Sequence, residues 1–157
     1  MSKRTNTKQQ GFTIIEVVLV LAIAAMIFLI VFLAVPALQR SQRDTQRHTD
    51  IGRLRTAITN YSGNHQGTLP TVDNAFLDKY LRVNSDKFQD PRGTDYTIDT
   101  TTNPDLTIKY SETAPKVYYK TGVTCNDDGT FKTGAATRVF AISMVLESGD
   151  LYCLGNG

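Results

Sequence analysis

Glu16 is the residue whose surroundings in the sequence most demand a chemical explanation. It lies four residues into an apolar segment, Phe12 to Val35, and the 19 residues of 17–35 carry no polar side chain. An ionised carboxylate in such a segment is costly unless a cation or a hydrogen-bond donor faces it. We therefore expect Glu16 to pair with a cation. The alternative is a protonated Glu16 that reaches the membrane surface without a partner.

The apolar segment is long enough to cross a membrane as a helix. At about 1.5 Å per residue, its length covers most of a hydrocarbon core of roughly 30 Å. A basic leader precedes it, with Lys3, Arg4 and Lys8 and no acidic residue. An ordinary secretory signal has a shorter apolar core followed by a small-residue cleavage site, whereas here Arg40 and Arg43 follow. The sequence therefore predicts a transmembrane helix over residues 12–35.

The boundary Gly11-Phe12-Thr13-Ile14-Ile15-Glu16 resembles the class III signal peptide of type IV pilins and pseudopilins. This resemblance implies that residues 1–11 are a leader, which a prepilin peptidase removes after Gly11 on the cytoplasmic face. The same enzyme would methylate the new amino group of Phe12. Residues 12–35 would then serve both as membrane anchor and as assembly segment. One difference is that Pro36 stands at the end of the apolar segment, whereas the family often has a helix-weakening proline within it.

Removal of the leader would supply the cation that Glu16 lacks. The freed α-amino group of Phe12 is cationic below a pKa of about 8. Placed against Glu16 of a neighbouring subunit, it offsets much of the desolvation cost of both charges and sets the axial register.

The resemblance implies a structural subunit of a type IV pilus or pilus-like filament that polymerises with other pilin subunits. The implied partners are prepilin peptidase, a pilus assembly platform with its ATPase, and the cytoplasmic membrane. The subunit would wait there as a single-pass protein, head outside, before joining a cell-surface filament. Two alternatives stay open. One is a pseudopilin of a type II secretion-like system, and the other is a membrane-anchored module for adhesion or DNA uptake.

Cys125 and Cys153 are the two cysteines of the chain. In an exported domain such a pair predicts one disulfide. It would close a loop of 29 residues and contribute about 3.6 kcal/mol by the chain-entropy relation. Two free thiols in a reducing compartment are the alternative. Two cysteines and two distant histidines are too few for a zinc site.

The segment after the apolar run predicts a continuing helix. Residues 39–50 contain no apolar side chain, and pairs such as Arg40–Asp44 and Asp44–His48 have helical spacing. An apolar stripe then recurs at helical intervals, formed by Ile51, Leu54, Ile58 and Tyr61. We expect one helix from about residue 13 to residue 61, with residues 36–61 as a stem that docks onto the head and Gly63 as its stop.

Arg40, Arg43 and Arg47 are predicted to form a positive ridge on this stem. The simplest interpretation is a solvated helix face, to which His48 would also belong. Lipid phosphates, acidic surfaces of adjacent subunits and DNA are the ligands that such a ridge would fit, and DNA is the least favoured of them. The remaining residues, 61–157, hold 9 basic and 12 acidic residues, so the head has no general affinity for polyanions.

Residues 62–157 predict a small head in an α+β fold. A polar loop region contains a short helix over residues 74–81. The turn Asp90-Pro91-Arg92-Gly93 is similar to the turn after the helix in major pseudopilins and some compact pilins. The last third predicts an antiparallel sheet with strands near 117–120, 137–146 and 151–154. The bulky face of the middle strand, which we expect to pack on the helix stripe, comprises Phe140, Ile142, Met144 and Leu146.

Asn126, Asp127 and Asp128 could supply oxygens to a calcium ion, but Asp128-Gly129 is also a hairpin pair. We expect the hairpin and no metal. The sequence contains no phosphate-binding glycine loop, no H-E-x-x-H and no nucleophile elbow, so we expect neither an enzyme nor a cofactor.

Overall fold

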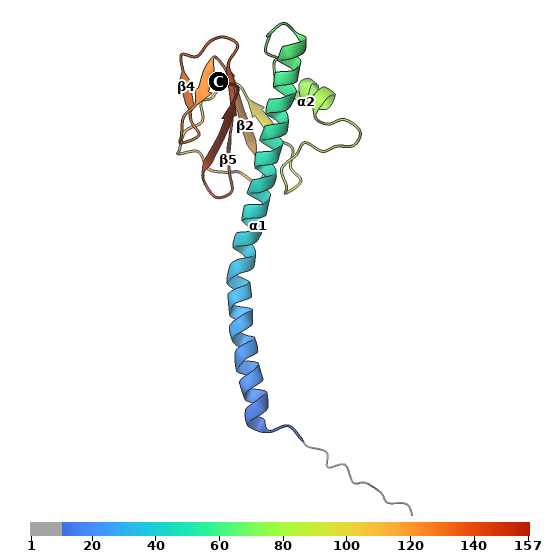
Figure 1. The fold of residues 1–157 in the computed structure, drawn as a ribbon, viewed down its shortest axis with the longest axis vertical. Coiled ribbons are helices and arrows are strands. Elements are labelled where there is room, and N and C mark those ends of the chain that lie inside the picture. Colours follow the sequence, from blue (N-terminus) through green and yellow to red (C-terminus); the bar gives the residue numbers. More distant parts are fainter. Residues whose placement is uncertain (1–10) are drawn as a thin grey trace, which may run out of the picture. The chain divides into compact units, whose positions relative to one another are not determined.

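The computed structural model describes residues 11–157, so the predicted basic leader lies largely outside the described residues. The protein is an α+β fold with a long N-terminal helix and a small sheet (Figure 1). It divides into two compact units, Met1–Gln39 and Arg40–Gly157. We call the second of these the C-terminal unit.

The first helix, α1, spans Ile14–Asn64, as the sequence predicts, and Pro36 lies inside it. The predicted stop at Gly63 is wrong, because Gly63 lies within the last helical turn. The chain leaves the helix through Gln66 and Gly67, which have φ of 55° and 84°. The amide of Gly67 donates to the carbonyl oxygen of Ser62 at 2.8 Å. The glycine that permits the left-handed exit is therefore Gly67.

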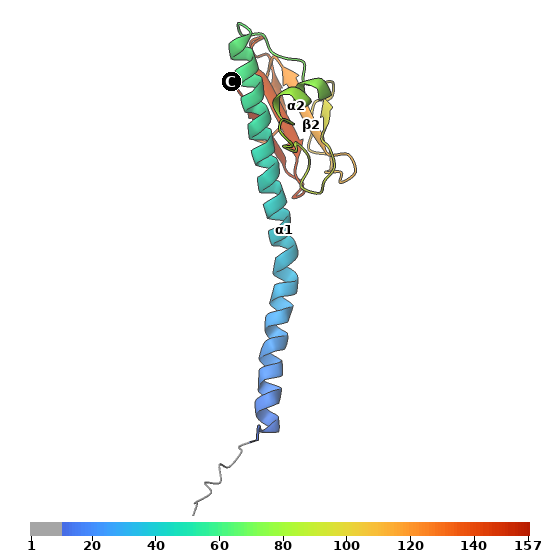
Figure 2. The same cartoon turned by 90° about the vertical axis from the view of Figure 1, so that its right-hand side faces the viewer.

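A second, short helix, α2, spans Asn74–Tyr80, close to the predicted 74–81. Asp73 caps it, with its carboxylate accepting a hydrogen bond from the amide of Phe76 at 2.8 Å. The helix buries Phe76 and Leu77 on the side that meets the core. Figure 2 shows α2 packed beside the C-terminal part of α1.

Six strands follow: β1 (Thr97–Asp99), β2 (Lys116–Thr121), β3 (Val123–Cys125), β4 (Phe131–Thr133), β5 (Phe140–Val145) and β6 (Leu151–Gly155). Four of them form one sheet in the order β1-β2-β5-β6, and β3 pairs with β4. The pairs β2–β5 and β5–β6 are antiparallel, as expected, but β1 pairs with β2 in parallel. The long loop 100–115 allows this pairing, because a parallel pair needs a crossover rather than a hairpin.

The two faces of β5 pack against different partners. Phe140, Ile142 and Met144 share one buried cluster with the helix stripe that contains Ile51, Leu54 and Ile58. This confirms the predicted packing on α1 for these three residues, whereas the fourth, Leu146, is buried but lies beyond the end of β5 and outside this cluster. The odd-numbered residues Ala141 and Val145 pack instead with residues of β2 and of the β3–β4 hairpin. The sheet is thus covered on both faces, and this fixes the register of β5.

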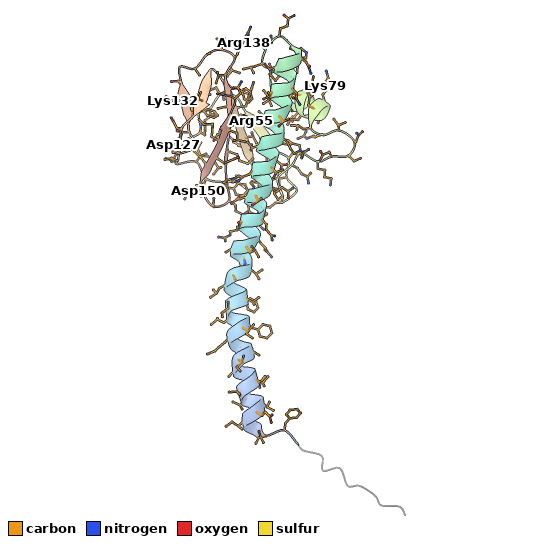
Figure 3. All side chains as sticks on the ribbon, viewed as in Figure 1. Arg55, Lys79, Asp127, Lys132, Arg138 and Asp150 are labelled. Carbon is orange, nitrogen blue, oxygen red and sulfur yellow. A yellow bond between two sulfur atoms is a disulfide. The ribbon has the colours of Figure 1, made fainter. Side chains whose placement is uncertain are left out.

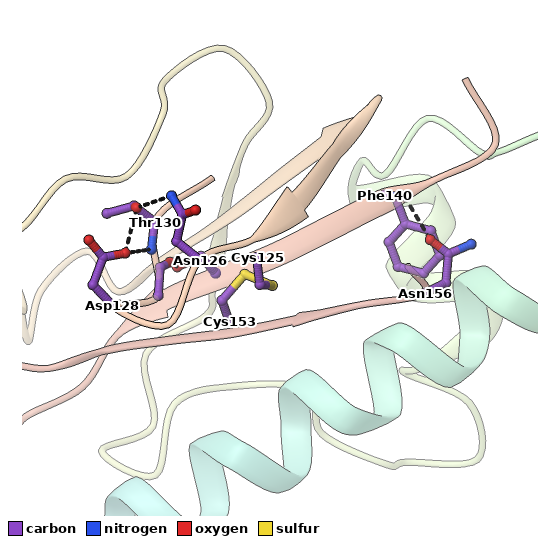
Figure 4. The surroundings of a disulfide bond; sticks show 9 residues. Cys125, Asn126, Asp128, Thr130, Phe140, Cys153 and Asn156 are labelled. Atoms are coloured by element: carbon purple, nitrogen blue, oxygen red, sulfur yellow. Dashed lines mark hydrogen bonds between the residues drawn. A yellow bond between two sulfur atoms is a disulfide. The ribbon is translucent and has the colours of Figure 1, made fainter. Parts of the chain in front are cut away.

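A disulfide joins Cys125 of β3 to Cys153 of β6, with a Cα–Cα distance of 5.8 Å (Figure 4). The pairing expected from the sequence is therefore present. The bond ties the two-stranded hairpin to the last strand of the main sheet. Beside it, the turn from Asn126 to Thr130 is closed by a hydrogen bond of 2.9 Å from the amide of Asn126 to the carbonyl oxygen of Thr130, and the Asp128 carboxylate accepts from the Thr130 amide at 2.9 Å. The predicted hairpin at Asp128-Gly129 is confirmed by the pairing of β3 with β4.

Removing this disulfide should weaken the fold measurably. We expect the double variant Cys125→Ser/Cys153→Ser to lose about 3–4 kcal/mol in unfolding free energy, because the unfolded chain regains the entropy of an open loop. Urea unfolding of the full chain in detergent measures the loss. Under a reducing agent, the native chain should unfold at the same urea concentration as the variant. Equal stability of the oxidised native chain and the variant would contradict this role.

Candidate functional site

Thr13 and Glu16 form reciprocal hydrogen bonds at the start of α1. The amide of Glu16 donates to Thr13 Oγ1 at 3.4 Å, and the Thr13 amide and hydroxyl both lie 3.4 Å from Glu16 Oε2. A Thr at the helix cap with a Glu three residues later is the reciprocal arrangement called a capping box. Glu16 therefore satisfies orphan donors of its own helix and also places a negative charge at the positive end of the helix dipole.

The apolar side chains beyond Glu16 have no cover within the described protein. Phe12 is 85% exposed, and the large apolar residues from Ile14 to Leu38 are exposed as well. The helix α1 is long and apolar enough to cross a membrane, and its most apolar part has a mean hydropathy of 3.3. An apolar surface of this extent requires lipid or other protein around it. Glu16 thus stands at the first turn of the segment that must be covered.

The predicted solvated ridge on the stem is wrong, because Arg47 is fully buried. Its guanidinium binds Asp90 through two hydrogen bonds of 2.7 and 3.0 Å. It also donates to Asp44 at 2.7 Å and to the Tyr110 hydroxyl at 2.7 Å. Burial by itself lowers the pKa of Arg47, but the hydrogen bonds to Asp90 and Asp44 outweigh it and raise that pKa above its usual value. The buried guanidinium therefore stays charged.

Glu147, in the turn between β5 and β6, engages the other arginines. Arg43 binds it through two hydrogen bonds of 2.8 and 2.6 Å, and Arg92 donates at 2.7 Å. Asp44 accepts from the amides of Glu147 and Ser148 at 2.9 and 3.1 Å. Arg40 lies 4.0 Å from Glu147 with a side chain that is 65% exposed. Of the three ridge arginines, Arg40 alone points mainly to solvent, which leaves little of the predicted basic ridge.

We call the residues of this network, Asp44, Arg47, Asp90, Tyr110 and Glu147, the Arg47 cluster. They come from four distant parts of the chain, α1, the 90–93 turn, the 100–115 loop and the β5–β6 turn. The predicted i,i+4 pairs of Asp44 were replaced by an i,i+3 pair with Arg47. His48, expected on the solvated face, is half-buried and stacks on Tyr152 with ring centroids 3.9 Å apart. The cluster joins α1 to the loops of the sheet.

The stability supplied by Glu147 should depend on pH. The hydrogen bond from Arg43, opposed by burial and assisted by Arg92, lowers the pKa of Glu147 from 4.5 to about 2. A carboxyl group whose pKa is lower in the folded state stabilises the fold fully above its unfolded pKa. That contribution is lost as the pH falls from about 4.5 through about 2. The folded state therefore loses the Glu147 contribution on acidification.

Comparison of the native chain with Glu147→Gln tests this. We expect the variant to be less stable by about 2 kcal/mol at pH 7, with the difference shrinking below pH 4.5. Urea midpoints at pH 7, 4 and 2.5 measure it, and Glu112→Gln is the matched control because that side chain is 60% exposed. A difference between the native chain and Glu147→Gln that stays constant with pH would contradict the electrostatic role of Glu147.

Comparison with known proteins gives one match, and it covers the start of α1. Residues 6–32 match the family model described as Prokaryotic N-terminal methylation motif. No curated protein and no solved structure matches the chain. The fold is a pilin-like α+β arrangement, and the chain carries the class III signal peptide of type IV pilins and pseudopilins. The motif supports a pilin-like or pseudopilin-like substrate of a prepilin peptidase, and together with the apolar helix it suggests membrane anchoring.

Sequence reasoning missed two features of these regions. The role of Thr13 as a helix cap could have been predicted, because Thr-x-x-Glu before an apolar run is the sequence signature of a capping box. The Arg47 cluster could not be predicted from the sequence, because two of its three acidic members, Asp90 and Glu147, lie 43 and 100 residues away from Arg47 in the chain. The i,i+3 spacing of Asp44 and Arg47 was the one local signal, and it is equally common on solvated helices.

Proposed function

We propose that this protein is a structural subunit of a type IV pilus or a pilus-like filament. A prepilin peptidase removes residues 1–11 after Gly11, the new amino group of Phe12 is methylated, and residues 12–35 hold the subunit in the cytoplasmic membrane until assembly. A platform and its ATPase then add the subunit to a filament. The observation that carries this proposal is the methylation motif of residues 6–32, which includes the start of an exposed apolar helix at Ile14.

The proposed assembly contact joins Phe12 of one subunit to Glu16 of another. The capping box supports this role, because it holds the carboxylate at the helix start while leaving its second oxygen, Oε1, out of the hydrogen bonds to Thr13. A neighbouring α-amino group can therefore approach without breaking the cap. Within lipid or a helix bundle, each of the two charges is expensive alone and much less so together. The pair favours one axial register between neighbouring helices.

A short pseudopilin rod of a secretion system is the second candidate. The observation in its favour is the turn at Asp90, where the amide of Asp90 donates to Thr94 O at 2.8 Å and that of Gly93 to Asp90 O at 2.7 Å. This is the turn that resembles major pseudopilins. The disulfide between Cys125 and Cys153 favours a surface pilus instead. A filament outside the cell needs the added stability of a covalent cross-link more than a rod inside the envelope does.

Mass spectrometry of the native protein tests the proposal. The expected result is a mature chain that begins at N-methylated Phe12, recovered from sheared surface material in which electron microscopy shows filaments. Long filaments would indicate a pilus, and short rods confined to the envelope would indicate a pseudopilus. An intact chain beginning at Met1, with no polymer, would overturn the proposal in favour of a membrane-anchored binding module.

A further inference from the structure

A groove lies between α1 and α2 in the C-terminal unit. Its volume is about 570 Å³, and the residues of α1 that line it include three small ones, Gly52, Thr56 and Ala57. Tyr80 and Leu81 form the wall on the α2 side, and Arg53 and Arg55 also line it. Small residues on one helix and an aromatic ring on the other leave room for an inserted turn.

The groove carries positive charge that the described protein leaves available. Arg55 and Lys79 are exposed, and neither forms an ion pair with any residue of 11–157. Lys79 does not line the groove, but its ammonium lies 5.3 Å from the ring centroid of Tyr80, which does. Arg53 is already engaged by Asp50 and Asp86. An acidic ligand would therefore find one cation without an ion pair in the groove, Arg55, and a second, Lys79, beside it.

The turn between β3 and β4 carries the opposite charge. Asp127 and Asp128 are exposed at its tip, and Asp150 is exposed in the neighbouring β5–β6 turn. In Figure 3 the exposed Lys132 of β4 lies on the same side of the C-terminal unit as Asp127 and Asp150. The hydrogen bonds from the Thr130 side chain and amide lower the pKa of Asp128, so its carboxylate stays ionised.

The β3–β4 turn is also held by close contacts, and a turn that is ordered before binding loses little motion on binding. Its disulfide neighbour Cys125 is bonded to Cys153 (Figure 4). Gly129, with φ of 82°, packs so closely on β6 that an added Cβ would lie 2.5 Å from Leu151 O. The hydroxyl of Ser143, on β5, donates a hydrogen bond of 2.8 Å to the carbonyl oxygen of Gly129. The acidic tip is thus presented in one conformation.

We propose that the Asp127–Asp128 turn of one protomer docks into the α1–α2 groove of a second copy of this chain. In Figure 1, β4 and α2 lie on opposite sides of α1, and in Figure 3 Asp127 and Lys79 do so as well. Turn and groove therefore remain free to bind two different neighbours. Such a head-to-tail contact repeats along an open helical array rather than closing as a two-fold dimer. The inference rests on the proposed function, since it names a lateral contact of that filament.

Zero-length cross-linking in cells tests the contact. A carbodiimide joins a carboxylate to a lysine amine, so Asp127 or Asp128 should become linked to Lys79. Two full-length variants are co-expressed, Lys79→Arg and Asp127→Asn/Asp128→Asn. In the mixture the link can form only between different molecules, because each variant lacks one of the two reactive groups. We expect the linked peptide in the mixture and in neither variant alone.

Two controls separate a specific contact from random collision. Links from Asp127 or Asp128 to Lys109, which is exposed but outside the groove, should stay at background. Adding Arg55→Glu to the copy that provides Lys79 should lower the Lys79 link about tenfold through like-charge repulsion. Arg138→Glu, an exposed site outside the groove, should leave it unchanged.

The outcomes distinguish this contact from the proposed function. If processed subunits are recovered in filaments while the Lys79 link stays at the Lys109 background, the docking proposal is wrong and the filament function stands. If the chain keeps Met1 and yields no polymer, the function itself is wrong. A Lys79 link that is insensitive to Arg55→Glu would likewise contradict docking in this groove.

Discussion

Replacing Glu16 with alanine should leave cleavage after Gly11 intact and reduce the yield of filaments by about a hundredfold. The size follows from removing one partner of a desolvated ion pair, which costs about 3 kcal/mol or more and leaves the Phe12 amine without a counter-charge. Processing should survive, because the leader and the Gly11-Phe12 bond are unchanged. N-terminal mass spectrometry of membranes and the quantity of sheared filament measure the two effects separately.

Because Glu16 also caps its own helix, matched variants are needed to separate charge from capping. Glu16→Gln retains the capping-box geometry but not the charge, so it should lose filaments as severely as Glu16→Ala. Thr13→Val removes the cap hydroxyl and keeps the charge, and losing a cap costs about 1 kcal/mol, or roughly fivefold in yield. Thr13→Ser should behave like the native chain. If Glu16→Gln assembled normally, the role of Glu16 would be capping alone.

Replacing Arg47 with methionine should destabilise the C-terminal unit by about 3–5 kcal/mol. Methionine roughly fills the volume, but Asp90 is fully buried and Asp44 nearly so, and both would lose their counter-charge. A domain of this size has a total stability of about 5–15 kcal/mol, so the variant should be largely unfolded in mild denaturant. Tyrosine near-ultraviolet circular dichroism during urea unfolding of the full chain measures this.

Two further variants identify the cause. Arg55→Met, an exposed change on the same helix, should alter the unfolding free energy by no more than about 0.5 kcal/mol. Adding Asp90→Asn to Arg47→Met should recover part of the loss, because an amide is cheaper to bury than an unpaired carboxylate. If the double variant were no more stable than Arg47→Met, lost packing rather than unpaired charge would explain the effect.

The parts of the structure that the sequence predicted well are those fixed by periodicity. The helix α1 begins and ends within three residues of the expected positions, and the even-numbered face of β5 packs on the stripe of Ile51, Leu54 and Ile58. Both follow from the spacing of apolar side chains, which depends only on neighbours in the chain. The methylation motif is similarly local, since the match lies within residues 6–32, and it could therefore be recognised from the sequence alone.

The parts that could not be predicted depend on residues distant in the chain. A stretch without apolar side chains, 39–50, predicts a solvated helix face, yet Arg47 is buried because Asp90, Tyr110 and Asp44 complete its hydrogen bonds. The parallel pairing of β1 with β2 likewise depends on the path of the 100–115 loop, about which strand propensity says nothing.

The most direct test of the account is the distance between two groups in the assembled filament. An electron cryomicroscopy reconstruction of purified fibres would locate the amino nitrogen of Phe12 and the carboxylate of Glu16 in adjacent subunits. The account predicts that they lie within ion-pairing distance, about 4 Å. Fibres in which these groups are widely separated, with no water bridging them, would contradict it.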